Sequence, residues 1–398
     1  MSRQGWVFKR CGKCSKRVVA KRCECGYDKA SWTWIADIHA KGQERKSKMA
    51  GGFKTRAEAV AGMAAELAKR DAGTFIEPSK LTVREYLAGW LDTVQPPTIR
   101  GSTFVSYRHS ARVVSDRIGD MLLQQVTRQT IRALYASLAA EGNKRSGGGL
   151  SSKTVHNLHL SLHRALDAAV EDGLIATNPA DRGHKVTGDR PEMQVWTADQ
   201  VVTFLAAVRG DRLYGLWRLL VATGLRRGEA LGLRWADVAL DATTLRVTRQ
   251  LVRGPGGLAW GSPKTAKGRR LIALDATTLA ELRRHRARQA EERLAWGPDY
   301  RDGDLVFSRE NGSPLDPDRV TGAFERHVRR LGLPRLTLHG LRHTHATLGL
   351  SAGVHVKVMS ERLGHSTVAM TLDVYSHVIP AMQADAADRI AALIEAAG

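Results

Sequence analysis

The chain has 398 residues, of which 61 are Lys or Arg and 40 are Asp or Glu, so its formal net charge is +21 and its pI about 10.3. At ~100–200 residues per domain, this length predicts several domains, and a hydrophobic content of 43% excludes wholesale disorder. No apolar run approaches the ~18 residues that cross a bilayer, and residues 1–10 lack the apolar segment of a secretory signal. We therefore expect a cytoplasmic protein with no membrane partner that binds a polyphosphate.

The first 79 residues carry 17 basic and 8 acidic side chains, a net charge of +9. This is the densest positive charge in the chain and predicts a dedicated nucleic-acid-binding segment. All four cysteines lie there, at Cys11, Cys14, Cys23 and Cys25. A Cys-x-x-Cys pair lets two sulfurs reach one ion, which favours a closed, structural zinc site. The single residue between Cys23 and Cys25 is unusual for such a site, and reduced thiols in a loop are the alternative.

Two elements are predicted in this first segment. Residues 32–38, Trp-Thr-Trp-Ile-Ala-Asp-Ile, have strand character, and residues 55–69 form a helix with Thr55 as N-cap and Glu58 three residues later. We expect residues 1–73 to form a small sheet packed on one helix, with the strand lying in the major groove of DNA. The side chains expected to contact DNA are Trp32, Trp34, Lys41, Arg45, Lys46 and Lys48.

Residues 80–180 form a second predicted domain, a helical bundle. Its helices are expected at about 81–91, 102–118, 127–140 and 152–172, and Gln95-Pro96-Pro97 ends the first of them. A polar linker follows at 177–190 and precedes a third domain, residues 190–398. That domain begins with a helix capped by Thr197, contains a β-rich island at about 245–274, and is otherwise helical. The predicted fold is multidomain and mainly α with small β elements.

Four short blocks in the third domain carry chemical side chains. They are Thr223-Gly224-Leu225-Arg226-Arg227-Gly228-Glu229, Pro263 to Arg270 within the β-rich island, His339-Gly340-Leu341-Arg342-His343, and Leu363-Gly364-His365 with Tyr375 ten residues later. Each block alone has a structural explanation, such as a helix start or a solvated hairpin tip. Their conjunction, in this order, is the informative observation.

Together these blocks resemble the catalytic domain of the tyrosine recombinases, the phage integrase family. That family is marked by an Arg in a Thr-Gly-x-Arg-x-x-Glu block, a Lys on a β-hairpin, a His-x-x-Arg block, a later His or Trp, and a Tyr nucleophile. Here Arg342 precedes His365 by 23 residues, and all six positions are filled in order. The resemblance extends weakly over the whole chain, because many such integrases carry an arm-binding domain and a helical core-binding domain with a lambda-integrase-like architecture. The cysteine pairs depart from that pattern.

The resemblance implies a metal-independent enzyme that cuts and rejoins DNA strands. Tyr375 would attack phosphorus and hold it as a 3′-phosphodiester. Arg226 and Arg342 suit the non-bridging oxygens, because guanidinium groups match phosphate geometry. The general acid would be Lys264, with Lys267, Arg269 and Arg270 as competitors. His339 would take the tyrosine proton or orient the phosphate, and His365 would donate a hydrogen bond to a phosphate oxygen. Glu229 would support Arg226.

The implied partners are the core and arm DNA attachment sites of a phage or mobile element, and three further copies of the chain, since strand exchange between two duplexes needs four protomers. A host DNA-bending factor, an excision factor and a nucleoid location are further expectations. The segment 384–397 is interpreted either as core or as a helix that docks on a neighbouring protomer. His343, His345 and His377 are interpreted as structural. Two other functions stay open: a type IB topoisomerase, and a non-catalytic regulator derived from a recombinase.

Overall fold

In a computed structural model, the chain divides into two compact units, residues 1–99 with 103–188, and residues 100–102 with 189–398. The boundary between them at 188 falls inside the predicted linker. The structure describes residues 5–19, 23–25, 27, 29–37, 47–71, 76–142, 147–181, 194–263, 266–365, 367–375, 391–392 and 394–395.

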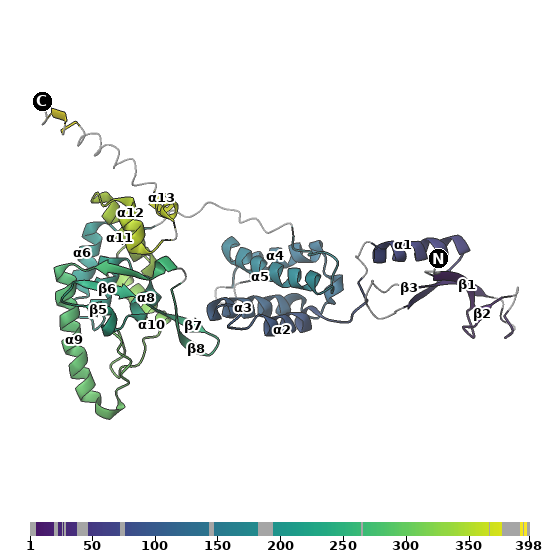
Figure 1. Cartoon of the computed structure of the whole chain (residues 1–398), viewed down its shortest axis with the longest axis horizontal. Coiled ribbons are helices and arrows are strands. Elements are labelled where there is room, and N and C mark those ends of the chain that lie inside the picture. The colour runs from purple at the N-terminus through teal and green to yellow at the C-terminus, as the bar shows by residue number, and fades with distance from the viewer. Residues whose placement is uncertain are drawn as a thin grey trace. The chain divides into compact units, whose positions relative to one another are not determined.

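An antiparallel sheet opens the first unit, with strand order β2 (Arg17–Val18), β1 (Gly5–Cys11), β3 (Ala30–Asp37) and β4 (Ser47–Phe53). Helix α1 (Arg56–Asp71) packs on this sheet, chiefly on β3 (Figure 1). The predicted cap of α1 is present, because the Glu58 N–H donates to Thr55 Oγ1 at 3.1 Å and the Thr55 N–H donates to the Glu58 carboxylate at 3.4 Å. The predicted sheet and helix are therefore both found.

A helical bundle completes the first unit. Its helices are α2 (Val83–Thr93), α3 (Gly101–Ile118), η1 (Leu123–Gln125), α4 (Arg128–Glu141) and α5 (Ser152–Glu171). Thr82, Thr127 and Ser151 accept hydrogen bonds from the first-turn N–H groups of α2, α4 and α5, which places the helix starts within two residues of the predicted positions. Their apolar faces share one core that includes Leu87, Val155 and Leu166.

Helices also dominate the second unit. They are α6 (Ala198–Ala207), α7 (Tyr214–Thr223), α8 (Arg227–Gly232), η2 (Trp235–Asp237), η3 (Ala266–Gly268), α9 (Ala276–Trp296), η4 (Gly297–Asp299), α10 (Pro317–Arg330), α11 (Leu338–Ser351), α12 (Val356–Leu363) and α13 (Val368–Tyr375). Aromatic rings fill the centre of the core, where Phe324 lies 5.3 to 5.9 Å from the rings of Trp196, Phe204 and Trp217. This core holds α6, α7 and α10 together.

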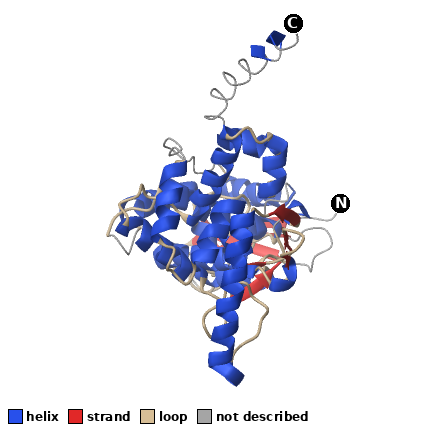
Figure 2. Ribbon diagram, turned by 90° about the vertical axis from the view of Figure 1, so that its left-hand side faces the viewer, coloured by secondary structure: helices blue, strands red, loops and turns tan. Residues whose placement is uncertain are grey.

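The predicted β-rich island forms two separate sheets rather than one hairpin. One sheet has the order β5 (Val238–Ala239), β6 (Thr244–Val247) and β9 (Arg270–Ala273), and β7 (Gln250–Gly254) pairs with β8 (Gly257–Gly261) in the other. In Figure 2 the strands are small patches among helices, which confirms the predicted fold class. No helix in the described ranges is long and apolar enough to cross a membrane.

Candidate active site

Arg226 lies at a tight corner between two helices. Helix α7 ends at Gly224, whose φ of +63° and whose neighbour Leu363, 2.7 Å from the position of a Cβ, leave room for glycine only. The chain then reverses into α8, where the Arg226 N–H donates to Glu229 Oε2 at 3.0 Å and Arg226 Nη1 donates to Glu229 Oε1 at 2.8 Å. Glu229 is 2% exposed and the Arg226 side chain 35%. Glu229 thus fixes a guanidinium that stays accessible.

Glu229 is shared with a second arginine, Arg270 of β9. Arg270 Nη2 lies 2.9 Å from Glu229 Oε2, and the Arg270 side chain is only 6% exposed. The same guanidinium donates to the carbonyl oxygens of Arg362 at 2.7 Å and Gly268 at 3.1 Å. Burial alone would raise the pKa of Glu229, but Arg270 and then Arg226 outweigh it and hold that pKa below its usual range. Arg270 therefore joins α8, η3 and the end of α12.

The second candidate catalytic arginine, Arg342, lies on α11, which begins after Thr337, an N-cap that accepts from the Gly340 N–H. Arg342 is 2% exposed. Its Nη1 donates to the Gly224 carbonyl at 2.8 Å and its Nη2 to the Leu363 carbonyl at 2.7 Å. It thereby connects the corner that carries Arg226 to the segment that leads into His365.

His365 lies two residues after the end of α12 and is buried. Its Nδ1 lies 2.8 Å from Thr371 Oγ1 of α13, which leaves Nε2 as the nitrogen that can face a substrate. Desolvation lowers the pKa of His365 to about 4, and the positive charges of Arg342 and Arg226 act in the same direction. The imidazole is therefore neutral at physiological pH.

His339 stands on the first turn of α11, with its side chain accessible at the surface. Desolvation lowers its pKa, and Arg342 and Arg226 lower it further. Arg226 Nη2 donates to the Gly364 carbonyl at 3.4 Å, next to His365, and His339 lies one helical turn before Arg342 on α11. With the bonds of Arg342 to Gly224 and Leu363, four of the six predicted catalytic side chains therefore lie at one place: Arg226, His339, Arg342 and His365.

The two remaining catalytic candidates are less fully described. Tyr375 is the last residue of α13, four residues after the buried Thr371, and its side chain lies outside the described part of the structure. Lys264 lies outside the described residues altogether. Among its competitors, Arg270 is held by a carboxylate and two carbonyl groups, whereas Lys267 and Arg269 are exposed.

Two of the three histidines interpreted as structural, His343 and His345, lie in the described part of the chain. His345 Nδ1 lies 2.9 Å from the Val221 carbonyl, and Arg362 Nε donates to His345 Nε2 at 3.2 Å. Both ring nitrogens of His345 are therefore hydrogen-bonded within the protein. His343 stacks edge-on against His339, with ring centroids 4.7 Å apart. His377 lies outside the described residues.

The N-terminal sheet corrects one predicted DNA contact. Trp34 is 2% exposed and packs under α1, and Trp32, two residues earlier on the same face of β3, is partly buried against the same core. Trp34 therefore cannot reach a base edge, and we withdraw it from the candidate contacts. Lys48 lies 3.1 Å from Glu66, while Lys41, Arg45 and Lys46 lie outside the described residues.

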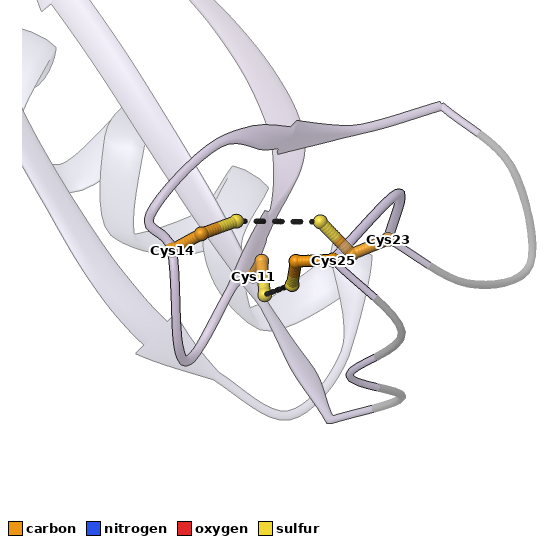
Figure 3. A group of neighbouring side chains, drawn as sticks. All are labelled: Cys11, Cys14, Cys23 and Cys25. Carbon is orange, nitrogen blue, oxygen red and sulfur yellow. Dashed lines mark hydrogen bonds between the residues drawn. The ribbon is translucent and has the colours of Figure 1, made fainter.

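The four cysteines, by contrast, come together. Cys11, Cys14, Cys23 and Cys25 converge from the end of β1 and the segment before β3, with all four sulfurs within 4.8 Å of one another (Figure 3). They form a group that could hold a metal ion.

Arg270 is the residue whose role the sequence did not reveal, and it supports a stability prediction. Replacing Arg270 with Met should lower the free energy of unfolding by about 3–5 kcal/mol, because it leaves the buried Glu229 carboxylate without one of its two cations. Urea denaturation of the full chain measures this. Arg269→Met, at the exposed neighbouring position, is the matched control and should change stability by less than about 0.5 kcal/mol. Equal effects of the two substitutions would contradict the role given to Arg270.

Comparison with known proteins identifies the family that the C-terminal part of the chain matches. Residues 194–382 match the model of the phage integrase family. The chain is 29% identical to a XerC-like tyrosine recombinase of Caldanaerobacter subterraneus over 357 residues, which covers 85% of this chain and 90% of that protein.

Solved structures give the same result. The Tn1549 transposon integrase in complex with a circular intermediate DNA is 28% identical, with a TM-score of 0.62 over 74% of this chain and 95% of that one. A lambda integrase tetramer bound to a Holliday junction, 18% identical, shares the fold with a TM-score of 0.54 over 80% of this chain and 90% of that one. Residues 194–382 are thus a phage integrase domain, of the tyrosine recombinase type.

Proposed function

We propose that the protein is a site-specific recombinase that cleaves and rejoins DNA strands through a 3′-phosphotyrosine intermediate and a Holliday junction, and so integrates or excises a phage or mobile element. The observation that carries this proposal is the convergence of Arg226, His339, Arg342 and His365 at one site, just before the helix that ends at Tyr375. The relationship to recombinases and integrases supports it.

In the proposed reaction the Tyr375 hydroxyl oxygen attacks phosphorus, a P–O bond to tyrosine forms, and the bond to the 5′ oxygen breaks. His339 takes the tyrosine proton, since its lowered pKa keeps it neutral. Arg226 and Arg342 neutralise the non-bridging oxygens, and His365 donates through Nε2. Lys264 gives a proton to the leaving 5′ oxygen.

The side chains named here supply every group that cleavage needs, so we propose no cofactor for the reaction. Glu229 and Arg270 act by positioning: Glu229 holds Arg226, and Arg270 holds Glu229. A like-charged carboxylate would repel the phosphate if it were exposed, but Glu229 is buried and neutralised by both arginines.

The domains would divide the DNA between them. Residues 190–398 would carry catalysis, residues 80–180 would bind the core site, and residues 1–73 would bind a separate arm site. Strand exchange between two duplexes requires four active sites, so the working assembly would be a tetramer on DNA. A host DNA-bending factor and an excision factor are proposed partners, and the site of action would be the cytoplasm, at the nucleoid.

The arm assignment has a direct consequence. Deleting residues 1–70 should abolish recombination between full attachment sites, because arm-site binding is lost. Cleavage of a core-site substrate should persist, because the bundle has its own core, separate from that of the sheet. Both activities are measured on labelled DNA, and unchanged recombination by the shortened chain would refute the arm assignment.

The proposed function is tested by recombination of cloned attachment sites, taken from the DNA that flanks the gene. The proposal predicts recombinant junctions at a defined sequence. Relaxation of supercoiled plasmid without recombinant junctions would instead identify a type IB topoisomerase. DNA binding without any strand cleavage would identify a non-catalytic regulator.

A further inference from the structure

Two groups in the described ranges bring three or more metal-binding side chains together. One of them, His163 with Asp167 and Asp181, is a group of side chains that already contact one another. Its ring nitrogens already face the two carboxylates, at 2.9 Å and 3.4 Å, and Asp167 also accepts from Asn178 at 2.7 Å. The other group is the set of four cysteines, whose sulfurs, in the described part of the chain, contact one another and the Lys13 N–H.

The sulfur positions fit one tetrahedral ion. Cys11 Sγ lies 3.6 Å from Cys25 Sγ, and Cys14 Sγ lies 3.3 Å from Cys23 Sγ (Figure 3). Four thiolates around zinc at ~2.3 Å have sulfur–sulfur separations of about 3.8 Å. A disulfide requires ~2.05 Å. The observed sulfur–sulfur distances are thus close to those of a zinc site and longer than a disulfide bond. All four sulfurs lie in one group, whereas a disulfide would join only two.

The backbone presents the cysteines from two facing turns. In the first, the Cys11 N–H donates to the Lys16 carbonyl at 2.9 Å and the Ser15 N–H donates to the Cys11 carbonyl at 3.2 Å. In the second, the Cys23 N–H donates to the Tyr27 carbonyl at 3.4 Å. Within the first turn, the Lys13 N–H also points at Cys11 Sγ, at 3.4 Å. A backbone N–H bonded to sulfur stabilises a thiolate, the form that binds metal.

The surrounding charge is suited to such a site. One Zn²⁺ with four thiolates carries a net charge of −2, and the chain around the first turn holds Arg10, Lys13, Lys16 and Arg17. Arg10 is held in place by its Nε, which donates to the Ser15 carbonyl at 2.8 Å. These cations offset the charge that the site would add.

The N-terminal sheet also lacks a large core of its own. Among the described residues, its buried hydrophobic cluster consists of Trp34, Ala36 and Ala59, with partly buried neighbours on β1, β3, β4 and α1. A structure of this size generally needs a metal or a disulfide to hold it together. Because Cys11 ends β1 and Cys25 precedes β3, an ion between them would tie the β1–β2 hairpin to the next strand.

We propose that Cys11, Cys14, Cys23 and Cys25 bind one Zn²⁺ as a closed four-thiolate site that stabilises the N-terminal sheet. The site has no open coordination position, so it is structural. It is separate from strand cleavage and does not depend on the recombinase assignment.

Elemental analysis and thiol titration of the full-length protein test this proposal. We expect one zinc ion per chain, and because the sequence contains only four cysteines, a thiol reagent should find four protected thiols that react once the zinc is displaced. Co²⁺ in place of zinc should give the visible absorption of tetrahedral thiolate coordination. Cys14→Ser should lose zinc and become sensitive to protease in residues 1–71. Glu24→Ser, an exposed position between Cys23 and Cys25 with no role in the site, is the matched control and should keep one zinc ion.

A zinc-free protein with four freely reactive thiols, or with two disulfides, would overturn the proposal. So would a Cys14→Ser protein that retains one zinc ion. Cleavage of a core-site substrate after zinc removal with a chelator tests whether the recombinase activity is independent of the zinc site. We expect this cleavage to persist. Loss of cleavage together with zinc would mean that the metal takes part in catalysis, which contradicts a structural site.

Discussion

Replacing Tyr375 with Phe is expected to eliminate the covalent protein–DNA complex on a nicked suicide substrate. The substitution removes the one oxygen that forms the bond to phosphorus and leaves the ring in place. Loss of a nucleophile of this kind lowers the rate by a factor on the order of 10⁴ or more. The complex is measured by denaturing gel electrophoresis, in which only covalently attached DNA stays with the protein.

The matched control for this experiment is Tyr300→Phe, the same chemical change at a tyrosine that follows η4, on a segment that contributes nothing to the candidate site. It should form the complex at the wild-type rate. A covalent complex formed by the Tyr375→Phe protein would contradict the assignment of the nucleophile. Core-site binding by both variants, followed by gel shift, verifies that folding and DNA binding are intact.

The second large effect is expected at Arg226. Replacing Arg226 with Lys keeps a positive charge but removes the planar fork that contacts Glu229 and, in the proposed reaction, a phosphate oxygen. We expect the single-turnover cleavage rate to fall by about 10²–10³, as on removal of other preorganised transition-state donors. Stability should change little, because Glu229 keeps its ion pair with Arg270.

The neighbouring position provides the control. Arg227 points away from the site, toward α10, where its Nη1 donates to the Pro317 carbonyl at 2.9 Å. Arg227→Lys should therefore cleave at close to the wild-type rate. If the two variants cleave equally fast, Arg226 does not stabilise the transition state and the proposed site is wrong.

Local signals in the sequence predicted the helices of the first two domains and the first helix of the third. The capping residues Thr55, Thr82, Thr127 and Thr197 each accept a backbone hydrogen bond at or near a predicted helix start. Such caps act over three residues, so a single sequence contains the information. The catalytic residues were found differently, through the order and spacing of the four blocks.

Other features depend on contacts between distant segments and were not predictable in this way. Arg270 sits among several basic residues, and only its approach to Glu229, 41 positions away, reveals a positioning role. The two sheets of the β-rich island likewise depend on β9 pairing with β6 across the β7–β8 hairpin.

Trp34 shows a different kind of error. Alternation along β3 predicts that Trp32 and Trp34 share one face of the sheet. The apolar side of α1 must pack against an apolar surface, and that face of β3 provides it. The DNA-contact interpretation overlooked that requirement. Burial of a large apolar side chain stabilises a fold by about 1.5–3 kcal/mol. In a small core this gain favours a buried Trp34 over one that is exposed to bind DNA.

Peptide mapping of the trapped complex tests the central claim most directly. The full-length protein is trapped on a suicide substrate, digested with trypsin and nuclease, and analysed by tandem mass spectrometry. Our account predicts one modified peptide, with a nucleotide linked through its 3′ phosphate to Tyr375. A nucleotide attached to another residue, or a tyrosine linked to a 5′ phosphate, would contradict it.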